Sequence, residues 1–417
     1  MKLLVALILA VVALPAQTPA ETEQAELNRA VNENAGSQID FIRALERHLT
    51  KYPESKQRLP IEKAIAKAAT ELNDVPRTVL YGEKVLTAEP SNADLALIDR
   101  VIRLLLDSDK PEPAEKALAW TKRYQREVEA LRGKAGQGHM SEGQWAEEIN
   151  KAMARTLVLE ARAIGNLGKP EEATTLALRA WETFPGSEAA RERARWLGRQ
   201  GKDGEALLCF ADAFTIEDVR TTHAERIADR THMGELQRKL NKSEAGLGDV
   251  VLAAFDRNLA LKASRAAALR QKDPNSVATE LTDFVLPRTE GTETLRIASL
   301  KGKTVVMDFW ATWCAPCRIQ HPLIENVKKT FEKDPNVVFL SVDSDEDRTV
   351  VPGFLKEMKW EGPSYFEAGL GRLLNIASIP TILILGPGGN VSSRMTGFIP
   401  ERFEDMLTER IRDASAN

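Results

Sequence analysis

The chain has 417 residues, more than one hydrophobic core usually organises, so we expect at least two domains. Its formal net charge of −4 and its pI near 5.9 provide no basic field that would attract nucleic acid. The composition therefore argues against a nucleic-acid-binding protein and is that of a chain able to bury sizeable cores.

The N-terminus has the pattern of an export signal. Met1 and Lys2 supply a positive start, Leu3 to Leu14 form an apolar run, and Ala16 is a small residue suited to cleavage. The run is shorter than the roughly 20 residues that span a bilayer, so we expect a removable signal peptide over residues 1–16 and no anchor. No later stretch is long and apolar enough to span a membrane. The sequence thus predicts a secreted protein with no membrane span after signal removal.

Residues 21–275 are predicted to form a helical domain, because apolar residues recur there at helical spacing between Pro and Gly breaks. The segment Gly168–Ala173 is echoed by Gly201–Ala206, an offset of about 33 residues, which is the period of a two-helix repeat. Small Ala residues follow each segment at helix-packing positions. Residues 154–221 therefore resemble tetratricopeptide repeats, which implies stacked helix pairs able to bind a protein partner.

After residue 275 the composition changes to frequent Gly and Pro with β-branched and aromatic runs, so we expect a second, α/β domain over residues 276–417. Alternation of strands and helices followed by a hairpin predicts a sheet covered on both faces. The expected elements, in chain order, are strands near 284–286 and 295–297, a buried strand over 304–310, a helix from the cysteines to about 333, a buried strand over 337–342, a helix near 351–359, strands over 381–385 and 391–396 joined by a Gly-rich turn, and a helix over 400–412.

The chain has three cysteines, too few for a framework of structural disulfides. Cys314 and Cys317 follow a buried strand and open a helix, which is typical of a redox pair. The helix dipole and free N–H groups at the helix start stabilise a thiolate, so we expect Cys314, on the exposed side of the turn, to be the nucleophile. Cys317, one turn inside, is expected to resolve the mixed disulfide. Cys209 is expected to be a buried, inert thiol.

Zinc is the alternative use of such a pair. A tetrahedral zinc site needs four ligands, and only His321 lies near the pair in the sequence. We therefore expect no metal and no organic cofactor. A hydrogen bond from His321 to a thiolate is an open alternative, although a packing role is favoured.

The segment Asp308-Phe309-Trp310-Ala311-Thr312-Trp313-Cys314-Ala315-Pro316-Cys317-Arg318, with Pro322 after it, resembles the thioredoxin superfamily. Ala311-Thr312-Trp313 and the strands near Phe284 resemble its secreted TlpA/ResA-like branch, and the resemblance covers about residues 277–417. It implies a thioredoxin-like fold and a periplasmic oxidoreductase that exchanges disulfides with protein thiols and disulfides. It also implies a membrane-bound thiol as electron donor. Strongly oxidising relatives carry a His between the cysteines, and its absence here favours the reducing direction.

The resemblance also assigns substrate-binding residues. The segment Ile379-Pro380-Thr381 resembles the family's cis-proline loop, whose backbone edge pairs with an extended substrate segment. An ordinary trans proline before a strand is the alternative. The residues expected to bind substrate are Trp313, Ala315, Pro316, Ile379, Pro380 and Thr381.

Asp308 occupies the position of the thioredoxin carboxylate that helps to move the proton of the resolving cysteine. Burial under a helix would raise its pKa, and Phe339 stands where thioredoxin has a lysine partner. The alternative is a solvated strand end. Related proteins often carry Glu within or just after the pair, where this chain has Ala315, Pro316 and Gln320, so a mechanism that depends on those acids is not expected.

Two other functions remain open at this point. A peroxiredoxin-like peroxidase has a related fold, but its cysteine follows a Pro-x-x-x-Thr-x-x pattern, and both Trp313 and the neighbouring Cys317 argue against it. The other is a protein-binding scaffold of helical repeats with an accessory redox domain. Thiol reactivity of the C-terminal domain would distinguish these functions from the favoured oxidoreductase.

Overall fold

The computed structural model describes residues 19–34, 36–90, 94–132, 139–397 and 399–416. The expected signal peptide over residues 1–16 lies outside them. The chain divides into two compact units, one ending at Glu127 and one beginning at Val128.

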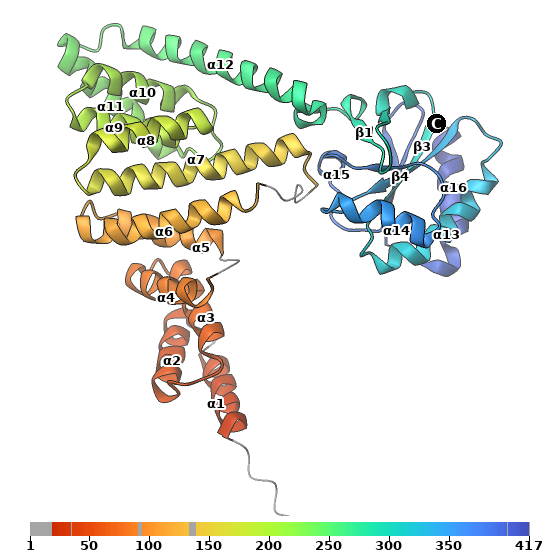
Figure 1. Ribbon diagram of the computed structural model, residues 1–417, viewed down its shortest axis with the longest axis horizontal. Helices are drawn as coiled ribbons and strands as arrows, with labels where there is room; N and C mark the ends of the chain where they lie inside the picture. Colours follow the sequence, from red (N-terminus) through yellow and green to blue (C-terminus); the bar gives the residue numbers. More distant parts are fainter. Residues whose placement is uncertain (1–18, 35, 91–93, 133–138, 398, 417) are drawn as a thin grey trace, which may run out of the picture. The chain divides into compact units, whose positions relative to one another are not determined.

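The described part of the first unit is helical. Its helices are α1 (Pro19–Glu33), α2 (Gln38–Lys51), α3 (Arg58–Glu71), α4 (Val75–Ala88), α5 (Leu95–Leu106) and α6 (Pro111–Glu129), the last of which ends in the second unit (Figure 1). Ser37, Asp74 and Asp94 begin α2, α4 and α5 as N-caps, because their side chains accept hydrogen bonds from N–H groups of the first turn. Ile42 and Ile65 pack together in the core of this unit.

The second unit starts with a longer helical stack. Its helices are α7 (Glu142–Asn166), α8 (Pro170–Thr183), α9 (Ser187–Arg199), α10 (Asp203–Thr215), α11 (His223–Asn241) and α12 (Leu247–Lys272), and α7 to α10 pack side by side in chain order (Figure 1). Helices α8 and α10 begin at Pro170 and Asp203, which are 33 residues apart as the repeat predicts. Ala177 and Ala213 are fully buried, so neighbouring helices approach closely. The helical N-terminal region is confirmed; membership of the tetratricopeptide class stays a prediction.

The rest of the second unit is an α/β domain. A five-stranded sheet has the order β5-β4-β3-β6-β7, and β1 and β2 form a separate antiparallel pair. β4 runs parallel to β3 and β5, whereas β6 is antiparallel to β3 and β7. The strands are β1 (Val285–Pro287), β2 (Thr294–Arg296), β3 (Thr304–Trp310), β4 (Val337–Asp343), β5 (Ser364–Phe366), β6 (Thr381–Leu385) and β7 (Val391–Thr396).

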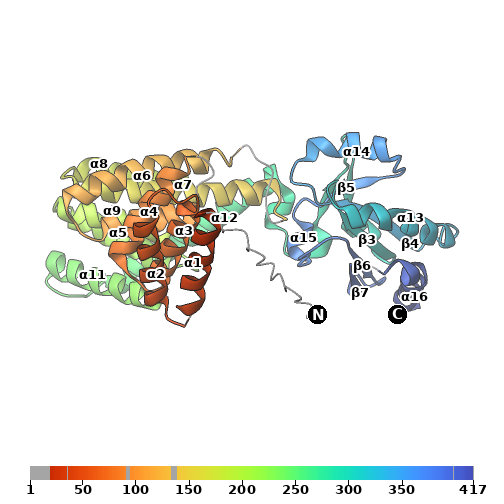
Figure 2. The ribbon, with the colours of Figure 1, turned by 90° about the horizontal axis from the view of Figure 1, so that it is seen from below.

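Alternate residues of β3 point to opposite faces of the sheet, and every residue of this strand is buried. Val306 packs in a cluster with residues of α13 and α16, while Met307 packs in another with residues of β1 and α15. The helices α13, α15 and α16 lie around β3 in Figure 2. The helices of this domain are α13 (Ala315–Thr330), α14 (Val351–Met358), α15 (Leu370–Leu373) and α16 (Phe403–Ala416). The prediction of an α/β thioredoxin-like domain after a helical region is confirmed.

Asp273 and Asn275 connect the helical stack to the α/β domain. The Asp273 carboxylate accepts a hydrogen bond of 2.7 Å from Gly143 N in the first turn of α7. The amide of Asn275, which is 2% exposed, donates to Val285 O and Ala368 O and accepts from Val285 N, at 2.8, 3.0 and 2.9 Å. Asn275, the last residue of the predicted helical domain, is therefore hydrogen-bonded to the α/β domain. A domain boundary between residues 275 and 276 stays a proposal.

Asn275→Ala should lower the free energy of unfolding of the α/β domain by about 2–3 kcal/mol, because it leaves buried backbone groups without partners. Urea unfolding of the full chain, followed by tryptophan fluorescence, measures the change. Asn336→Ala, at an exposed position, is the matched control and should stay within about 0.5 kcal/mol of the parent. An equal loss in both variants would contradict the anchoring role of Asn275.

Candidate active site

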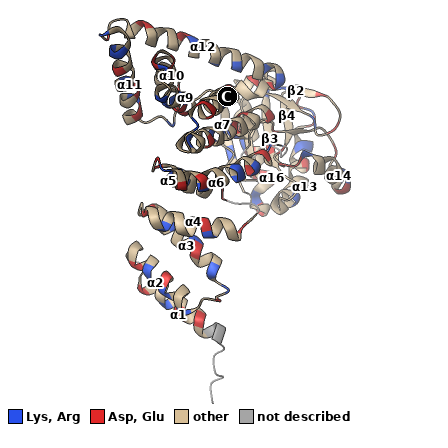
Figure 3. Ribbon diagram, turned by 60° about the vertical axis from the view of Figure 1, so that its left-hand side comes forward, with Lys and Arg blue, Asp and Glu red and all other residues tan. Residues whose placement is uncertain are grey.

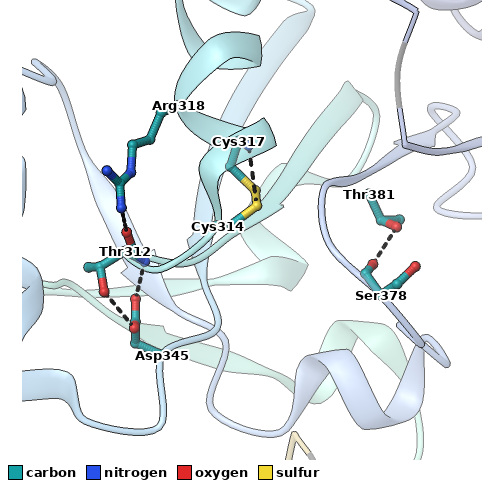
Figure 4. Close-up of a disulfide and its surroundings, with 7 residues drawn as sticks. All are labelled: Thr312, Cys314, Cys317, Arg318, Asp345, Ser378 and Thr381. Carbon is teal, nitrogen blue, oxygen red and sulfur yellow. Dashed lines mark hydrogen bonds between the residues drawn. A yellow bond between two sulfur atoms is a disulfide. The ribbon is translucent and has the colours of Figure 1, made fainter. Parts of the chain in front are cut away.

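Cys314 and Cys317 form a disulfide with an S–S distance of 1.99 Å across the first turn of α13 (Figure 4). Cys314 is the N-cap residue of this helix, and the N–H of Cys317 donates to Cys314 Sγ at 3.2 Å. The N–H groups and dipole at a helix start favour negative charge on this sulfur. After reduction, a thiolate at Cys314 is therefore stabilised by the helix that follows it.

Both cysteines are buried in this oxidised form, each with an exposed fraction of 3%. The prediction that Cys314 lies on the exposed side of the turn is wrong for the disulfide, because both residues belong to an apolar cluster with Trp310 and Val351, against which Ile379 packs. Trp313, by contrast, is 67% exposed. The surface next to the disulfide is therefore offered by Trp313 and not by the sulfur atoms.

Thr312 is held on two sides by hydrogen bonds. Asp345 accepts from Thr312 N at 2.6 Å and from its hydroxyl at 2.8 Å, and the Arg318 guanidinium donates to Thr312 O at 2.9 Å (Figure 4). These bonds fix the turn that leads into Cys314. The sequence analysis missed Asp345; its position two residues after a buried parallel strand is the signal that could have found it.

The peptide bond between Ile379 and Pro380 is cis, as the sequence predicted. This loop lies opposite the disulfide in Figure 4, and the Thr381 hydroxyl donates to Ser378 O at 2.7 Å. Ile379 packs against the cluster that contains both cysteines. The structure thus brings the expected loop to the disulfide.

Ala315 and Pro316, in the first turn of α13, are exposed, as is Ile319 one turn further. Together with Trp313 they make an apolar surface beside the disulfide. The sequence analysis did not single out Ile319, although its spacing of four residues from Ala315 on a helix places the two on one face.

Asp308 is buried in β3, with an exposed fraction of 8%, and is not a solvated strand end. Burial raises its pKa to about 7. Its Oδ1 atom has no hydrogen-bond partner and the carboxyl lines a cavity of about 110 Å³ together with Phe339 and His321. An acid with this pKa can exchange a proton near neutral pH.

His321 stacks on Trp360 with ring centroids 3.8 Å apart. Burial lowers the pKa of His321, so the neutral ring is favoured. This contact supports the packing role that the sequence favoured.

The sequence analysis missed a cluster of acidic residues close to the active site. Asp343, at the end of β4, is 1% exposed, and burial, followed by its interaction with Asp345, raises its pKa to about 9. Ser344 donates to Glu367 at 2.9 Å, and Glu367 contacts His139 Nδ1 at 2.8 Å, which raises the pKa of His139. An acidic run at the carboxyl end of a parallel strand was the available signal.

Cys209 is buried on α10, and burial raises its pKa to about 11, so it is a poor nucleophile at neutral pH.

Within the part of the chain that the structure describes, no three His, Cys, Asp or Glu residues are grouped as a metal site would require. None of the described helices has the length and apolar character needed to cross a bilayer.

A sequence model with the description thioredoxin-like matches residues 302–391. Thiol-disulfide oxidoreductase ResA of Bacillus subtilis is 30% identical over 137 residues, which are 32% of this chain and 75% of that protein. Thiol:disulfide interchange protein HelX of Rhodobacter capsulatus is 29% identical over 156 residues, covering 34% and 82%. The crystal structure of StoA from Bacillus subtilis aligns with 30% of this chain and 94% of that chain, at 25% identity and a TM-score of 0.27.

Proposed function

Because this chain belongs to the thioredoxin-like thiol–disulfide oxidoreductases, the family of ResA, we propose that it reduces disulfides of proteins outside the cytoplasm. The observation that carries the proposal is the Cys314–Cys317 disulfide at the start of α13, with Cys317 N–H donating to Cys314 Sγ. Catalytic roles for Cys314, Cys317 and Asp308 are part of the proposal.

In the reduced protein, the Cys314 thiolate attacks one sulfur of a substrate disulfide, whose S–S bond breaks. One substrate sulfur leaves and takes a proton, and the other stays joined to Cys314 as a mixed disulfide. Cys317 then loses its proton, attacks Cys314 Sγ and releases the second substrate thiol. The substrate gains two electrons and two protons. The cysteine pair supplies both electrons and the Cys317 proton, and solvent supplies the second proton, because Cys314 reacts as a thiolate.

Asp308 is proposed to accept the proton of Cys317 in the second step. Its raised pKa supports this role, since a carboxylate with a pKa of about 7 is a better base than an ordinary one. The cavity beside Asp308 also reaches His321, one helical turn after Cys317.

A substrate segment is proposed to dock on Trp313, Ala315, Pro316 and Ile319 and to pair with the backbone of the cis-proline loop, Ile379 to Thr381. These four residues are exposed, which supports docking of a substrate segment on them. An extended segment that pairs along a backbone edge gains affinity from main-chain hydrogen bonds, which any sequence can make. This docking mode suits an enzyme that accepts several protein substrates.

The proposal has three further parts. The reaction runs in the reducing direction, a membrane-bound thiol supplies the electrons, and residues 1–16 direct export to the periplasm. Ala315 and Pro316 between the cysteines supply no cation that would stabilise the reduced form. We expect a reduction potential nearer to that of thioredoxin, about −270 mV, than to that of DsbA, about −120 mV.

Equilibration of the full chain with glutathione buffers, quantified by alkylation of the free thiols, measures the reduction potential. A value near −120 mV would contradict the reducing direction. Failure of the fully reduced protein to reduce a model protein disulfide would contradict the proposed function itself.

The helical repeats are proposed to hold a protein partner. A groove of about 710 Å³ lies among α7, α9, α10 and α11, with paired charges such as Arg191 with Asp229 in its wall. Basic and acidic positions are interspersed along these helices (Figure 3), which suits a polar protein surface. If Cys314→Ser keeps partner binding, the scaffold and redox roles are separable.

A further inference from the structure

A groove of about 1260 Å³ lies beside the disulfide within the second unit. Trp313 and Ile379 line its end at the active site. The segment that follows β4 forms one side, and residues from the start of the helical stack, Glu142 and Trp145 among them, form the other. We name this space the acidic groove. The groove adjoins the surface at which the Cys314–Cys317 pair exchanges with a substrate disulfide.

Carboxyl groups outnumber cationic side chains in the wall of the acidic groove. The acidic residues are Glu142, Asp343, Asp345, Glu346, Asp347 and Glu367, and the basic ones are Arg132, Arg348 and His139. Each of the three basic residues already has an acidic partner: Arg348 contacts Glu142 at 2.7 Å, His139 contacts Glu367 at 2.8 Å, and Arg132 contacts Glu129 at 2.9 Å. Asp343, with its pKa raised to about 9, is uncharged near neutral pH, but the other five acidic residues still outnumber the three basic ones, so the groove presents net negative charge to a ligand.

Asp343 provides an independent sign that this wall is built for a ligand. The residue is 1% exposed and lines the groove, yet its Oδ1 atom has no hydrogen-bond partner. A buried acceptor without a partner is costly, and such atoms are rare in folded proteins. Because the pKa of Asp343 is raised to about 9, this carboxyl is uncharged near neutral pH, and its free oxygen can accept a hydrogen bond from an N–H donor of a ligand without forming an ion pair.

We propose, on the basis of the proposed function, that the acidic groove binds an extended segment of the substrate protein that carries Lys or Arg close to the exchanging cysteine. Trp313 and Ile379 contact the part of the substrate segment that lies next to the disulfide. Glu346, which is exposed, attracts the basic side chains, and Glu142 on α7 offsets the charge of Arg348, which would otherwise repel them. The helical region thus selects substrates for the α/β domain.

Two disulfide-linked peptides that differ only in flanking Arg or Glu residues test the proposal with the reduced full chain. The rate constant of reduction should be greater for the Arg peptide at low ionic strength, and the ratio should fall as salt is added. Glu346→Gln and Glu142→Gln should each reduce this ratio about two- to fivefold, because the first removes an exposed negative charge and the second leaves the cation of Arg348 without its partner. Glu357→Gln, an exposed position on α14 outside the groove, should leave it unchanged.

Equal rate constants for the two peptides would overturn the groove proposal and leave the proposed function intact. Reduction of neither peptide would count against the proposed function. A change with Glu346→Gln and none with Glu142→Gln would overturn the part assigned to the helical region. If Glu357→Gln reduced the ratio equally, the preference for the Arg peptide would come from the overall charge of the protein. That result would rule out the groove as its source.

Discussion

Cys314→Ser should abolish reduction of a model protein disulfide, whereas Cys317→Ser should accumulate a covalent adduct between Cys314 and the substrate. The first variant lacks the thiolate that the α13 N-terminus stabilises, and the second lacks the thiol that releases the mixed disulfide. A non-reducing gel and mass spectrometry of the adduct measure the outcome. The expected loss of turnover is at least about a thousandfold in either variant, because a covalent step is removed.

Cys209→Ser is the matched control and should keep full activity, because Cys209 is buried and its pKa is raised to about 11. Alkylation of the reduced protein at mildly acidic pH should label Cys314 before Cys317, and Cys209 only after unfolding. Labelling of Cys317 first, or full activity of both active-site variants, would reverse or remove the proposed roles.

Asp308→Asn should make the oxidised protein more resistant to unfolding as the pH rises from 5 to 8. Burial raises the pKa of Asp308 from 3.8 to about 7 in the folded protein, so the folded state binds more protons than the unfolded state in this window. Stability of the parent therefore falls by about 3 kcal/mol as the pH rises from 5 to 8, and by about 4 kcal/mol in all relative to strongly acidic pH. Asn does not ionise, so the variant lacks this loss.

Urea unfolding of parent and variant at several pH values measures the difference, and its pH dependence separates ionisation from any constant cost of burying an amide. Asp283→Asn, at an exposed position, is the control and should show no such trend. The variant should also release the mixed disulfide more slowly than it forms it, most clearly near neutral pH. Equal slowing of both steps would remove Asp308 from the resolving step.

Local sequence patterns predicted the parts of this protein that depend on neighbours along the chain. The cysteine pair at a helix start, the buried strand before it and the cis-proline loop all follow from short motifs. The strand β5 and the helix α15 were missed, because elements of three and four residues carry too little periodicity to detect.

Contacts between distant segments could not be predicted in the same way. Asp345 reaches Thr312 across 33 residues, and His139 reaches Glu367 across 228. Ile379, which packs against the cluster that contains Cys314, comes from another part of the chain. Such pairings are set by the tertiary fold, so the acidic groove could not be found from the sequence.

The short junction between the helical stack and the α/β domain has a kinetic consequence. Asp273 is bonded to α7 and Asn275, two residues later, is bonded to the α/β domain, so almost no free chain separates the two anchors. If a protein held on the helical repeats is long enough to reach the disulfide, it meets it as a tethered reactant, at an effective concentration in the millimolar range typical of short tethers. Even a weak attachment to the repeats would then raise the frequency of thiol encounters well above that of free diffusion.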